Sequence, residues 1–310
     1  MQDVTPLPVY RSGFVAVMGK PNVGKSTLLN AMLGQKVAAV SPRPQTTRKR
    51  QMGILTLDHA QAVFLDTPGV HKPRYKLGEA MNQEALGALQ ECDLILWIVD
   101  ASQLPDEEDQ LLAAHIAQLK RPVQTLIVLN KIDLVGKEEL LSNQAAYMDL
   151  LPQALRAQPQ PISATRGDGM EALLNEIIAH LPENPPYFPE DQLTDLYERD
   201  IAADLIREAA LHLLRDEVPH GIAVRIDQYT ERGENGAYVE ATLLVEKETH
   251  KGIVIGQGGS MLKQIGSQAR TEIESMSGRK VYLKLHVKVR KNWRNDEQVL
   301  KGFGYSKNPG

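Results

Sequence analysis

The sequence predicts two domains: an α/β domain with a mostly parallel six-stranded sheet, followed by a smaller α+β domain. From about residue 12 to 181, short apolar runs alternate with longer amphipathic stretches, as in a parallel sheet covered by helices. Four prolines then fall within residues 182–189, where neither a helix nor a central strand can continue. With 310 residues, 42% of them hydrophobic, the chain is long enough for two cores.

The first domain is expected to span residues 1–182, with a proline-rich linker at 183–194 and the second domain, with a C-terminal extension, at 195–310. The expected strands of the first domain are 14–18, 52–57, 61–65, 94–99, 124–129 and 160–162. Its expected helices are 25–33, 77–90, 106–119, 137–150 and 169–180. The second domain is expected to contain a helix at 195–214, strands at 221–229 and 237–246 around a turn at 231–236, helical segments around 253–276, a strand at 281–290 and a short helix from about 295.

Charge is distributed unevenly along the chain. The formal net charge is −4, which ordinarily argues against binding to nucleic acid. Residues 1–195 hold 17 basic and 23 acidic side chains, a net charge of −6, whereas the window 247–294 holds 11 basic and 3 acidic ones, a net charge of +8. A local basic field in an acidic protein indicates a docking face for a polyanion, and a solvated Lys/Arg face is the simpler alternative.

Cysteine content and hydropathy favour a cytoplasmic protein. Cys92 is the only cysteine, so no disulfide can form within the chain, and a reducing compartment suits it. Met1 to Pro8 show no signal-peptide pattern, and the longest apolar run, 94–99, is far shorter than the ~20 residues of a membrane helix. Any membrane contact is therefore expected to be peripheral.

A glycine-rich motif stands between the first expected strand and the first expected helix. The run Gly19-Lys20-Pro21-Asn22-Val23-Gly24-Lys25-Ser26, followed by Thr27, fits the pattern G-x-x-x-x-G-K-[ST]. In such a loop the backbone N–H groups and the helix N-terminus hold the phosphates, while Lys25 reaches the β- and γ-phosphate oxygens. The Ser26 hydroxyl would ligate Mg²⁺. We therefore predict that this run binds a nucleoside triphosphate.

Two further segments extend the phosphate side of the site. Asp66-Thr67-Pro68-Gly69 follows the strand 61–65, so the Asp66 carboxylate is placed to hold the Mg²⁺ shell and the Gly69 N–H to approach the γ-phosphate. Pro44-Gln45-Thr46-Thr47-Arg48 lies after the first helix, where a threonine hydroxyl would complete the Mg²⁺ shell. Thr47 is favoured as that ligand, with Thr46 as the alternative. A loop that is ordered by the triphosphate and released on hydrolysis is the basis of a switch.

The base is predicted to be guanine. Asn130-Lys131-Ile132-Asp133 follows the strand 124–129, and the Asp133 carboxylate can accept hydrogen bonds from guanine N1–H and its exocyclic amine. Adenine offers no donor at either position. The Lys131 stem can cover the base, and Asn130 can brace the phosphate loop. Ser163-Ala164 follows the strand 160–162, where a backbone N–H can meet guanine O6.

These five segments, in this order, resemble those of the translation-factor-related P-loop GTPases, and the resemblance covers nearly all of residues 12–181. It implies GTP and GDP as ligands, Mg²⁺ as cofactor, and Lys25, Asn22, Thr47 and Gly69 as residues that serve hydrolysis. Val70 stands where many switch GTPases carry the glutamine that orients the attacking water, so we expect slow intrinsic turnover. Members with an asparagine at the position of Asn22 use K⁺ as an additional positive charge, which makes K⁺ a candidate cofactor.

The second domain carries a motif typical of nucleic-acid binding. Gly256-Gln257-Gly258-Gly259 fits G-x-x-G between two amphipathic segments, within the element order α-β-β-α-α-β and inside the basic window. This arrangement resembles the type II KH domain, in which the loop approaches the sugar–phosphate chain of about four nucleotides. By itself the motif could equally be a turn between helices. Lys251 and Lys263 flank the loop and are included in the expected RNA site.

The last expected strand alternates with a period of two. Odd positions from Val281 to Val289 are apolar, and the even positions include Tyr282, Lys284, Lys288 and Arg290. This wet face is suited to RNA phosphates and bases, although a basic edge that discourages aggregation is the alternative. Lys284, Lys288, Arg290 and Lys291 are therefore expected RNA-binding residues. Trp293 could pack between elements or stack on a base.

The two domains together resemble the Era family of bacterial GTPases. That resemblance implies a monomeric GTPase that binds the 3′ end of 16S rRNA through its KH domain and assists assembly of the small (30S) ribosomal subunit. It also allows for peripheral contact with the inner membrane. Two alternatives stay open: a GTPase that acts on a protein or membrane partner with the KH-like domain as adaptor, and an RNA-binding module whose nucleotide is structural.

Overall fold

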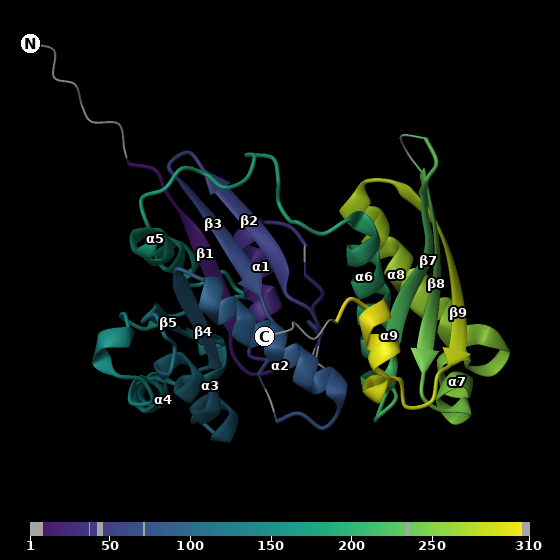
Figure 1. Cartoon of the computed structure of the whole chain (residues 1–310), viewed down its shortest axis with the longest axis horizontal. Helices are drawn as coiled ribbons and strands as arrows, with labels where there is room; N and C mark the ends of the chain where they lie inside the picture. Colours follow the sequence, from purple (N-terminus) through teal and green to yellow (C-terminus); the bar gives the residue numbers. More distant parts are fainter. Residues whose placement is uncertain (1–8, 37, 42–45, 71, 234–235, 306–310) are drawn as a thin grey trace, which may run out of the picture. The chain divides into compact units, whose positions relative to one another are not determined.

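The computed structural model describes residues 9–36, 38–41, 46–70, 72–233 and 236–305 (Figure 1). Pro44 and Gln45 of the expected switch loop and Glu234-Asn235 of the expected turn lie outside these residues. The chain forms two compact units. The first contains Met1–Gln35, Lys49–Val70 and Glu84–Asp195, and the second contains Lys36–Arg48, His71–Gln83 and Leu196–Gly310.

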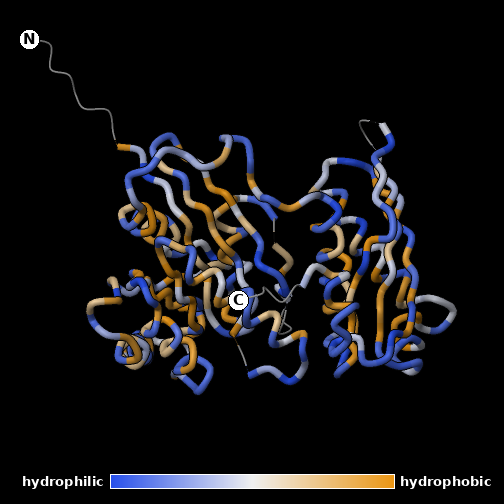
Figure 2. The backbone as a smooth tube through the Cα atoms, in the orientation of Figure 1, coloured by the Kyte–Doolittle hydropathy of each residue, from blue (hydrophilic) through white to orange (hydrophobic). Residues whose placement is uncertain are grey.

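The first unit is built on a six-stranded sheet with the order β2-β3-β1-β4-β5-β6. Its strands are β1 (Arg11–Met18), β2 (Gln51–Leu57), β3 (Ala60–Asp66), β4 (Leu94–Asp100), β5 (Gln124–Asn130) and β6 (Gln160–Pro161). All neighbours are parallel except β2 and β3, which are antiparallel. Strands β3 and β4 are buried along their whole length, because helices cover the sheet on both faces. Figure 2 shows these central strands as hydrophobic stretches of the chain.

Five helices follow the strands of this sheet: α1 (Lys25–Leu33), α2 (Lys76–Glu91), α3 (Glu107–Ala117), α4 (Lys137–Met148) and α5 (Met170–His180). Apolar residues of α3, α4 and the C-terminal half of α2, among them Ala88 and Ile116, form one buried cluster with the sheet. Within it, the rings of Tyr147 and Trp97 pack edge to face. Helices α1 and α5 lie on the other face of the sheet (Figure 1). The predicted mostly parallel α/β fold is confirmed.

The proline-rich segment after α5 lies along the first unit. The Ser12 hydroxyl donates to the backbone oxygen of Pro185 at 2.6 Å. The buried Gln61 side chain accepts hydrogen bonds from the backbone N–H groups of Tyr187 and Phe188 at 2.8 and 3.0 Å. The Ile54 N–H donates to the Leu193 oxygen at 2.8 Å. Most of the stretch expected as a linker is thus held by β1, β2 and β3.

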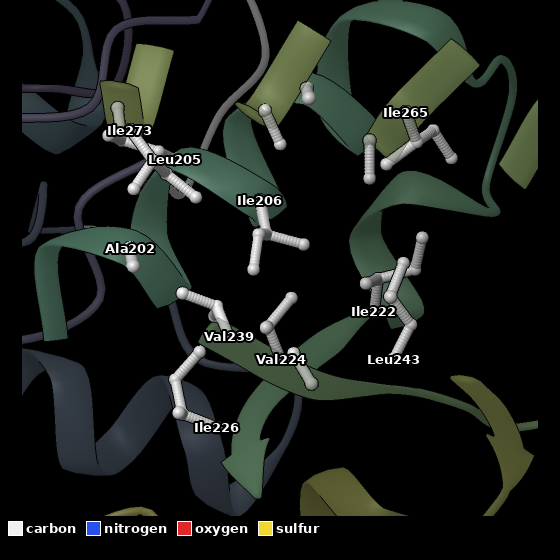
Figure 3. Close-up of a cluster of buried hydrophobic side chains, with 14 of the residues drawn as sticks. Ala202, Leu205, Ile206, Ile222, Val224, Ile226, Val239, Leu243, Ile265 and Ile273 are labelled. Carbon is white, nitrogen blue, oxygen red and sulfur yellow. The ribbon is translucent and has the colours of Figure 1, made fainter. Parts of the chain in front are cut away.

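In the core of the second unit, three helices pack on one face of a three-stranded sheet. The helices of this unit are α6 (Glu198–Leu213), α7 (Glu248–Ile255), α8 (Ser260–Ser277) and α9 (Glu297–Gly302), and its strands are β7 (Ala223–Glu231), β8 (Gly236–Val245) and β9 (Lys280–Val289). The short helix α9 near the C-terminus contributes Leu300 to a separate apolar cluster with Ala223 and Leu244 of the sheet. The central strand β8 is antiparallel to β7 and parallel to β9. Figure 3 shows Ile206 of α6 turned toward Val224 of the sheet, and Ile265 of α8 on the side of Ile222 and Leu243. The predicted α-β-β-α-α-β order is confirmed.

Among the residues that the structure describes, no helix is both long enough and apolar enough to cross a membrane.

Candidate functional site

The predicted nucleotide residues gather at the carboxyl ends of neighbouring parallel strands. Val17 of β1 is the register partner of Asp66, the last residue of β3. Asp100 and Asn130, the last residues of β4 and β5, are register partners of each other. In open α/β sheets this edge is where ligands bind.

The glycine-rich loop after β1 has two positions that accept only glycine. Gly19 has φ 141°, and a Cβ there would lie 2.2 Å from the Ile98 backbone oxygen. Gly24 has φ 103°, and a Cβ there would lie 2.2 Å from Asn130 Nδ2. Helix α1 begins at the next residue, so the backbone N–H groups of its first turn lie at the end of the loop, as a phosphate site requires.

Lys25 is held inside this loop. Its side chain is buried, and Nζ donates to the backbone oxygens of Gly19 at 3.0 Å and Lys20 at 2.8 Å. Burial lowers the pKa of Lys25 to about 8, against the opposing effect of the Asp66 carboxylate. An incoming phosphate would therefore meet a desolvated amine whose charge it stabilises.

Lys20 is a predicted nucleotide residue whose side chain turns away from the loop. Its Nζ lies 2.8 Å from Asp106 Oδ2 and 2.7 Å from Asp109 Oδ2. Asp106 caps the N-terminus of α3, and burial raises the pKa of Asp109 although Lys20 opposes that shift. The Lys20 side chain thus fastens the loop to α3, which leaves only its backbone for contact with phosphate.

The predicted metal ligands Ser26 and Asp66 are adjacent. Ser26 Oγ donates to Asp66 Oδ2 at 3.1 Å, and the Asp66 side chain is fully buried at the end of β3. A hydroxyl and a carboxylate are the oxygen ligands that suit Mg²⁺, so the donor set fits the ion. Thr47 is buried, and Thr46 Oγ1 donates to the Ser41 oxygen at 3.5 Å. Both threonines belong to the second unit, and the preference for Thr47 over Thr46 stays a prediction.

The two residues after Asp66-Thr67-Pro68 have different environments. A Cβ on Gly69 would lie 2.8 Å from the Pro21 backbone nitrogen, so the glycine backbone passes directly beside the phosphate loop. Val70 is buried in the apolar cluster that contains Met18 and Leu65. Its side chain is therefore part of the core.

Asn130 joins three parts of the site. Its Nδ2 donates to the Val23 backbone oxygen at 2.8 Å, and its Oδ1 accepts from the Ala164 N–H at 3.0 Å. The first bond fastens the phosphate loop in the way predicted for this residue. The second bond engages the amide of Ala164, one residue of the segment in which the sequence predicts a backbone donor to guanine O6. This pairing carries no sequence signal, since the two residues are 34 positions apart.

The residues predicted to recognise the base lie immediately after β5. Lys131 has φ 67°, and its Nζ donates to Asp100 Oδ2 at 2.7 Å, which orients the lysine stem. Asp133 Oδ1 is buried and has no hydrogen-bond partner among the described residues. A hydrogen bond from Ser163 lowers the pKa of Asp133 despite partial desolvation, and Arg166 adds to the effect. The carboxylate is therefore ionised and retains acceptor capacity, as recognition of guanine N1–H requires.

The G-x-x-G motif of the second unit forms the turn between α7 and α8. Gly256, Gly258 and Gly259 all have positive φ values. A Cβ on Gly256 would lie 2.7 Å from Met261 Cβ, whereas Cβ atoms on Gly258 and Gly259 would meet nothing within 4 Å. Gln257 and Gly258 are exposed. The tip of the turn is thus open to a ligand, and Lys251 and Lys263 stand on the two helices that flank it.

The predicted basic residues of β9 lie on the other face of the sheet from this turn. The odd residues of β9, such as Leu285, pack toward α8, where a Cβ on Gly266 would lie 3.4 Å from the Leu285 side chain. The even residues Lys284 and Lys288 therefore occupy the opposite face of the sheet. Arg290 and Lys291 follow the end of β9, and both are exposed. The geometry separates two groups that the sequence treated as one RNA site.

Trp293 packs inside the second unit. The residue is buried, and its Nε1 donates to the Gly221 backbone oxygen at 2.9 Å. Of the two roles considered for this residue, packing between elements is the one observed.

Comparisons with known proteins find matches for both the N-terminal and the C-terminal part of the chain. The family model for 50S ribosome-binding GTPases matches residues 14–131, and the KH domain model matches residues 217–294. GTPase Era of Ruminiclostridium cellulolyticum is 46% identical over 299 residues, which cover 96% of this chain and 99% of the relative. GTPase Era of Geobacter metallireducens is 47% identical over 298 residues, covering 96% and 98%.

Two solved structures are similar over nearly the whole chain. Era in complex with MgGDPNP and nucleotides 1506–1542 of 16S ribosomal RNA matches with a TM-score of 0.90 and 40% identity, covering 96% of this chain and 100% of that one. A variant of Aquifex aeolicus Era bound to GDP and aluminium fluoride matches with a TM-score of 0.88 and 39% identity over the same shares. The glycine-rich loop, the Asn130-Lys131-Ile132-Asp133 segment and the G-x-x-G turn thus stand in a chain that belongs to the Era family of GTPases.

Proposed function

We propose that this protein is a GTP-hydrolysing switch that binds the 3′ end of 16S rRNA through its KH domain and assists assembly of the 30S ribosomal subunit. The observation that carries the proposal is the match over 96% of the chain to an Era structure that holds both MgGDPNP and that RNA. The residues with which this chain would bind each ligand are those described above.

The nucleotide half of the proposal rests on hydrogen-bonding capacity. Asp133 Oδ1 is a buried acceptor with no hydrogen-bond partner in the described part of the chain, and guanine would supply the donors. Lys25 and the N–H groups at the start of α1 receive the phosphates, and Ser26 and Asp66 hold the metal side. Bound Mg²⁺ neutralises charge on the β- and γ-phosphates.

Hydrolysis is proposed to be slow unless it is stimulated. The buried Val70 side chain has no group that can orient the attacking water by hydrogen bonding. Asn22 is exposed with φ 66°, where its side chain is available to ligate K⁺ beside the phosphates. Equal hydrolysis rates in KCl and NaCl at matched ionic strength would remove K⁺ from the proposal.

The RNA half of the proposal rests on the open G-x-x-G turn. Gly258 has φ 58°, a conformation that aspartate and asparagine tolerate better than other side chains, and a Cβ there meets nothing. Gly258→Asp therefore places an anion beside the RNA phosphates with little steric cost, and Gly258→Asn is its uncharged control.

The experiment compares these two variants in full-length protein with the 16S rRNA fragment of nucleotides 1506–1542. We expect Gly258→Asp to weaken RNA binding about tenfold or more, because the added carboxylate repels the RNA phosphates. The affinity of Gly258→Asn should stay within about threefold of that of the unchanged protein, because asparagine adds no charge. If both variants bind like the unchanged protein, the turn does not hold RNA, and the KH-like domain is better explained as a protein adaptor.

The setting proposed for this activity is the cytoplasm, with the protein acting as a monomer and any membrane contact peripheral. The single cysteine, Cys92, is buried, which suits a reducing compartment. Co-purification with 30S particles, tested by sucrose-gradient sedimentation, is the expected result.

A further inference from the structure

The sheet of the second unit has a face turned away from α6 and α8, and a stacked pair of tyrosines stands on it. Tyr238 of β8 and Tyr282 of β9 are register partners. Their ring centroids are 5.7 Å apart, and the ring planes are inclined by 11°. Strand β9 is the edge of the sheet, and Tyr282 is 65% exposed. The outer ring of the pair is thus accessible at the rim.

The inner ring is fixed in place. The guanidinium carbon of Arg232 lies 4.8 Å from the centroid of the Tyr238 ring. The Tyr238 hydroxyl donates to Glu240 Oε2 at 2.8 Å. Tyr238 therefore acts as a backing for Tyr282, which lowers the entropy that a ligand stacking on Tyr282 would have to remove.

The charge around the pair favours an anionic ligand. Lys280, Lys284 and Lys288 are exposed on the even side of β9, along with Tyr282, over a length of about 26 Å. Two acids on this face are already paired. Glu240 accepts a hydrogen bond from Lys284 at 3.0 Å and lies 2.7 Å from His286 Nε2. Asp227 accepts a hydrogen bond from Thr242 Oγ1 and pairs with Arg225 at 2.7 Å. Hydrogen bonds from His286, Lys284 and Tyr238 lower the pKa of Glu240 to about 2, so its charge is countered by fixed neighbours.

We propose that this outer face binds a second stretch of single-stranded RNA, with one base stacked on Tyr282 and its phosphates on Lys280, Lys284 and Lys288. The inference rests on the proposed function, because it assigns a further contact to the same RNA. An exposed aromatic ring with a row of cations is the pattern of sequence-tolerant single-strand binding.

An RNA fits this face better than a protein does. A protein interface needs an apolar core, and among the described residues of β7, β8 and β9 the exposed large hydrophobic side chain is Tyr282. The face is also distinct from the G-x-x-G side, since α8 packs on the odd residues of β9 and Tyr282 is on the even side. A strand of RNA that crosses the β9 edge would contact both sides.

The test uses full-length protein and two RNA probes. The long probe is the 16S rRNA fragment of nucleotides 1506–1542, and the short probe is the shortest piece of it whose binding is lost in Gly258→Asp. Tyr282→Ala removes the ring, Tyr282→Phe keeps it, and Tyr197→Ala changes another exposed tyrosine as a matched control. Fluorescence anisotropy gives each affinity, and thermal melting confirms that each variant is folded.

We expect Tyr282→Ala to weaken binding of the long probe about tenfold, the usual size of one base stack, and to leave the short probe unchanged. Tyr282→Phe and Tyr197→Ala should bind both probes normally. As a second measurement, Lys288→Gln should reduce the salt slope of long-probe binding by about 0.7, one phosphate contact on a single strand.

Unchanged long-probe binding in both Tyr282→Ala and Lys288→Gln would overturn the inference and leave the face to a protein partner. Equal weakening of both probes by Tyr282→Ala would also overturn it, because the ring would then belong to the G-x-x-G site. Failure of the proposed function looks different: the unchanged protein would bind neither probe.

Discussion

At the scale of single residues, the predicted nucleotide site contains polar groups whose hydrogen-bonding or charge requirements are only partly met in the folded chain. The buried Asp133 Oδ1 has no partner among the described residues, and the Lys25 amine is held by two backbone oxygens while burial lowers its pKa. Each of these states costs stability in the free protein, and we expect a bound nucleotide to relieve it. Two predictions follow from them.

Asp133→Asn should weaken GTP binding by about 100-fold or more, because a donor then faces the N1–H of guanine in place of an acceptor. The same variant should gain affinity for xanthosine triphosphate, whose base presents the complementary edge. Nucleotide titrations measure both effects, and Asp149→Asn, the same change at an exposed side chain, serves as control. Unchanged GTP affinity in Asp133→Asn would contradict the assignment of the base site.

Nucleotide binding should take up a proton at alkaline pH. The pKa of Lys25 is about 8 without ligand, and triphosphate oxygens stabilise the charged amine, so the pKa rises on binding. GTP affinity should therefore fall as the pH rises through 8, with about three quarters of a proton taken up at pH 8.5. Calorimetry at that pH in two buffers of different ionisation enthalpy measures the uptake. Identical binding enthalpies in the two buffers would show that Lys25 is already charged.

The sequence could identify the residue types of this site because the motifs are local. It could not show that the Lys20 side chain pairs with Asp106 and Asp109, more than 80 positions away, or that the Ala164 amide is taken by Asn130. These pairings depend on which strands become neighbours in the sheet, a property of the folded chain.

At the scale of elements, periodicity located nearly every helix and strand. The apolar runs between 94 and 130 became the buried strands β4 and β5, and the period of two in β9 correctly divided a buried from a wet face. Composition was less informative for the proline-rich segment. Proline excludes regular structure but does not exclude side-chain contacts, and Gln61 holds this segment with hydrogen bonds that no local pattern encodes.

At the scale of the whole molecule, the two compact units do not coincide with a simple division of the sequence. Residues 36–48, which carry the predicted metal-binding threonine, belong to the second unit with the KH domain. Within that unit, buried Arg48 donates to the Ile222 backbone oxygen at 2.6 Å. A division at the prolines, inferred from composition, could not reveal this, because the contact joins residues 174 positions apart.

Because residues 46–48 belong to the same unit as the KH domain, we expect GTP binding and RNA binding to be coupled. A triphosphate that orders the 46–48 segment would change a part of the chain that packs with the RNA-binding domain, and coupling between two ligands is reciprocal. A coupling of the usual size, about 1–3 kcal/mol, corresponds to a change in affinity of about 5- to 150-fold.

The most direct measurement of the central claim, a guanine-nucleotide switch on RNA binding, is the affinity of the full-length protein for the 16S rRNA fragment of nucleotides 1506–1542 with saturating MgGDPNP and with saturating MgGDP. Asp133→Asn at the same nucleotide concentrations is the control. These concentrations saturate the unchanged protein but not the variant, so the variant should bind the RNA equally in the two nucleotide solutions. We predict that the RNA binds at least about fivefold more tightly with MgGDPNP. Equal affinity in the two nucleotide states would contradict the switch.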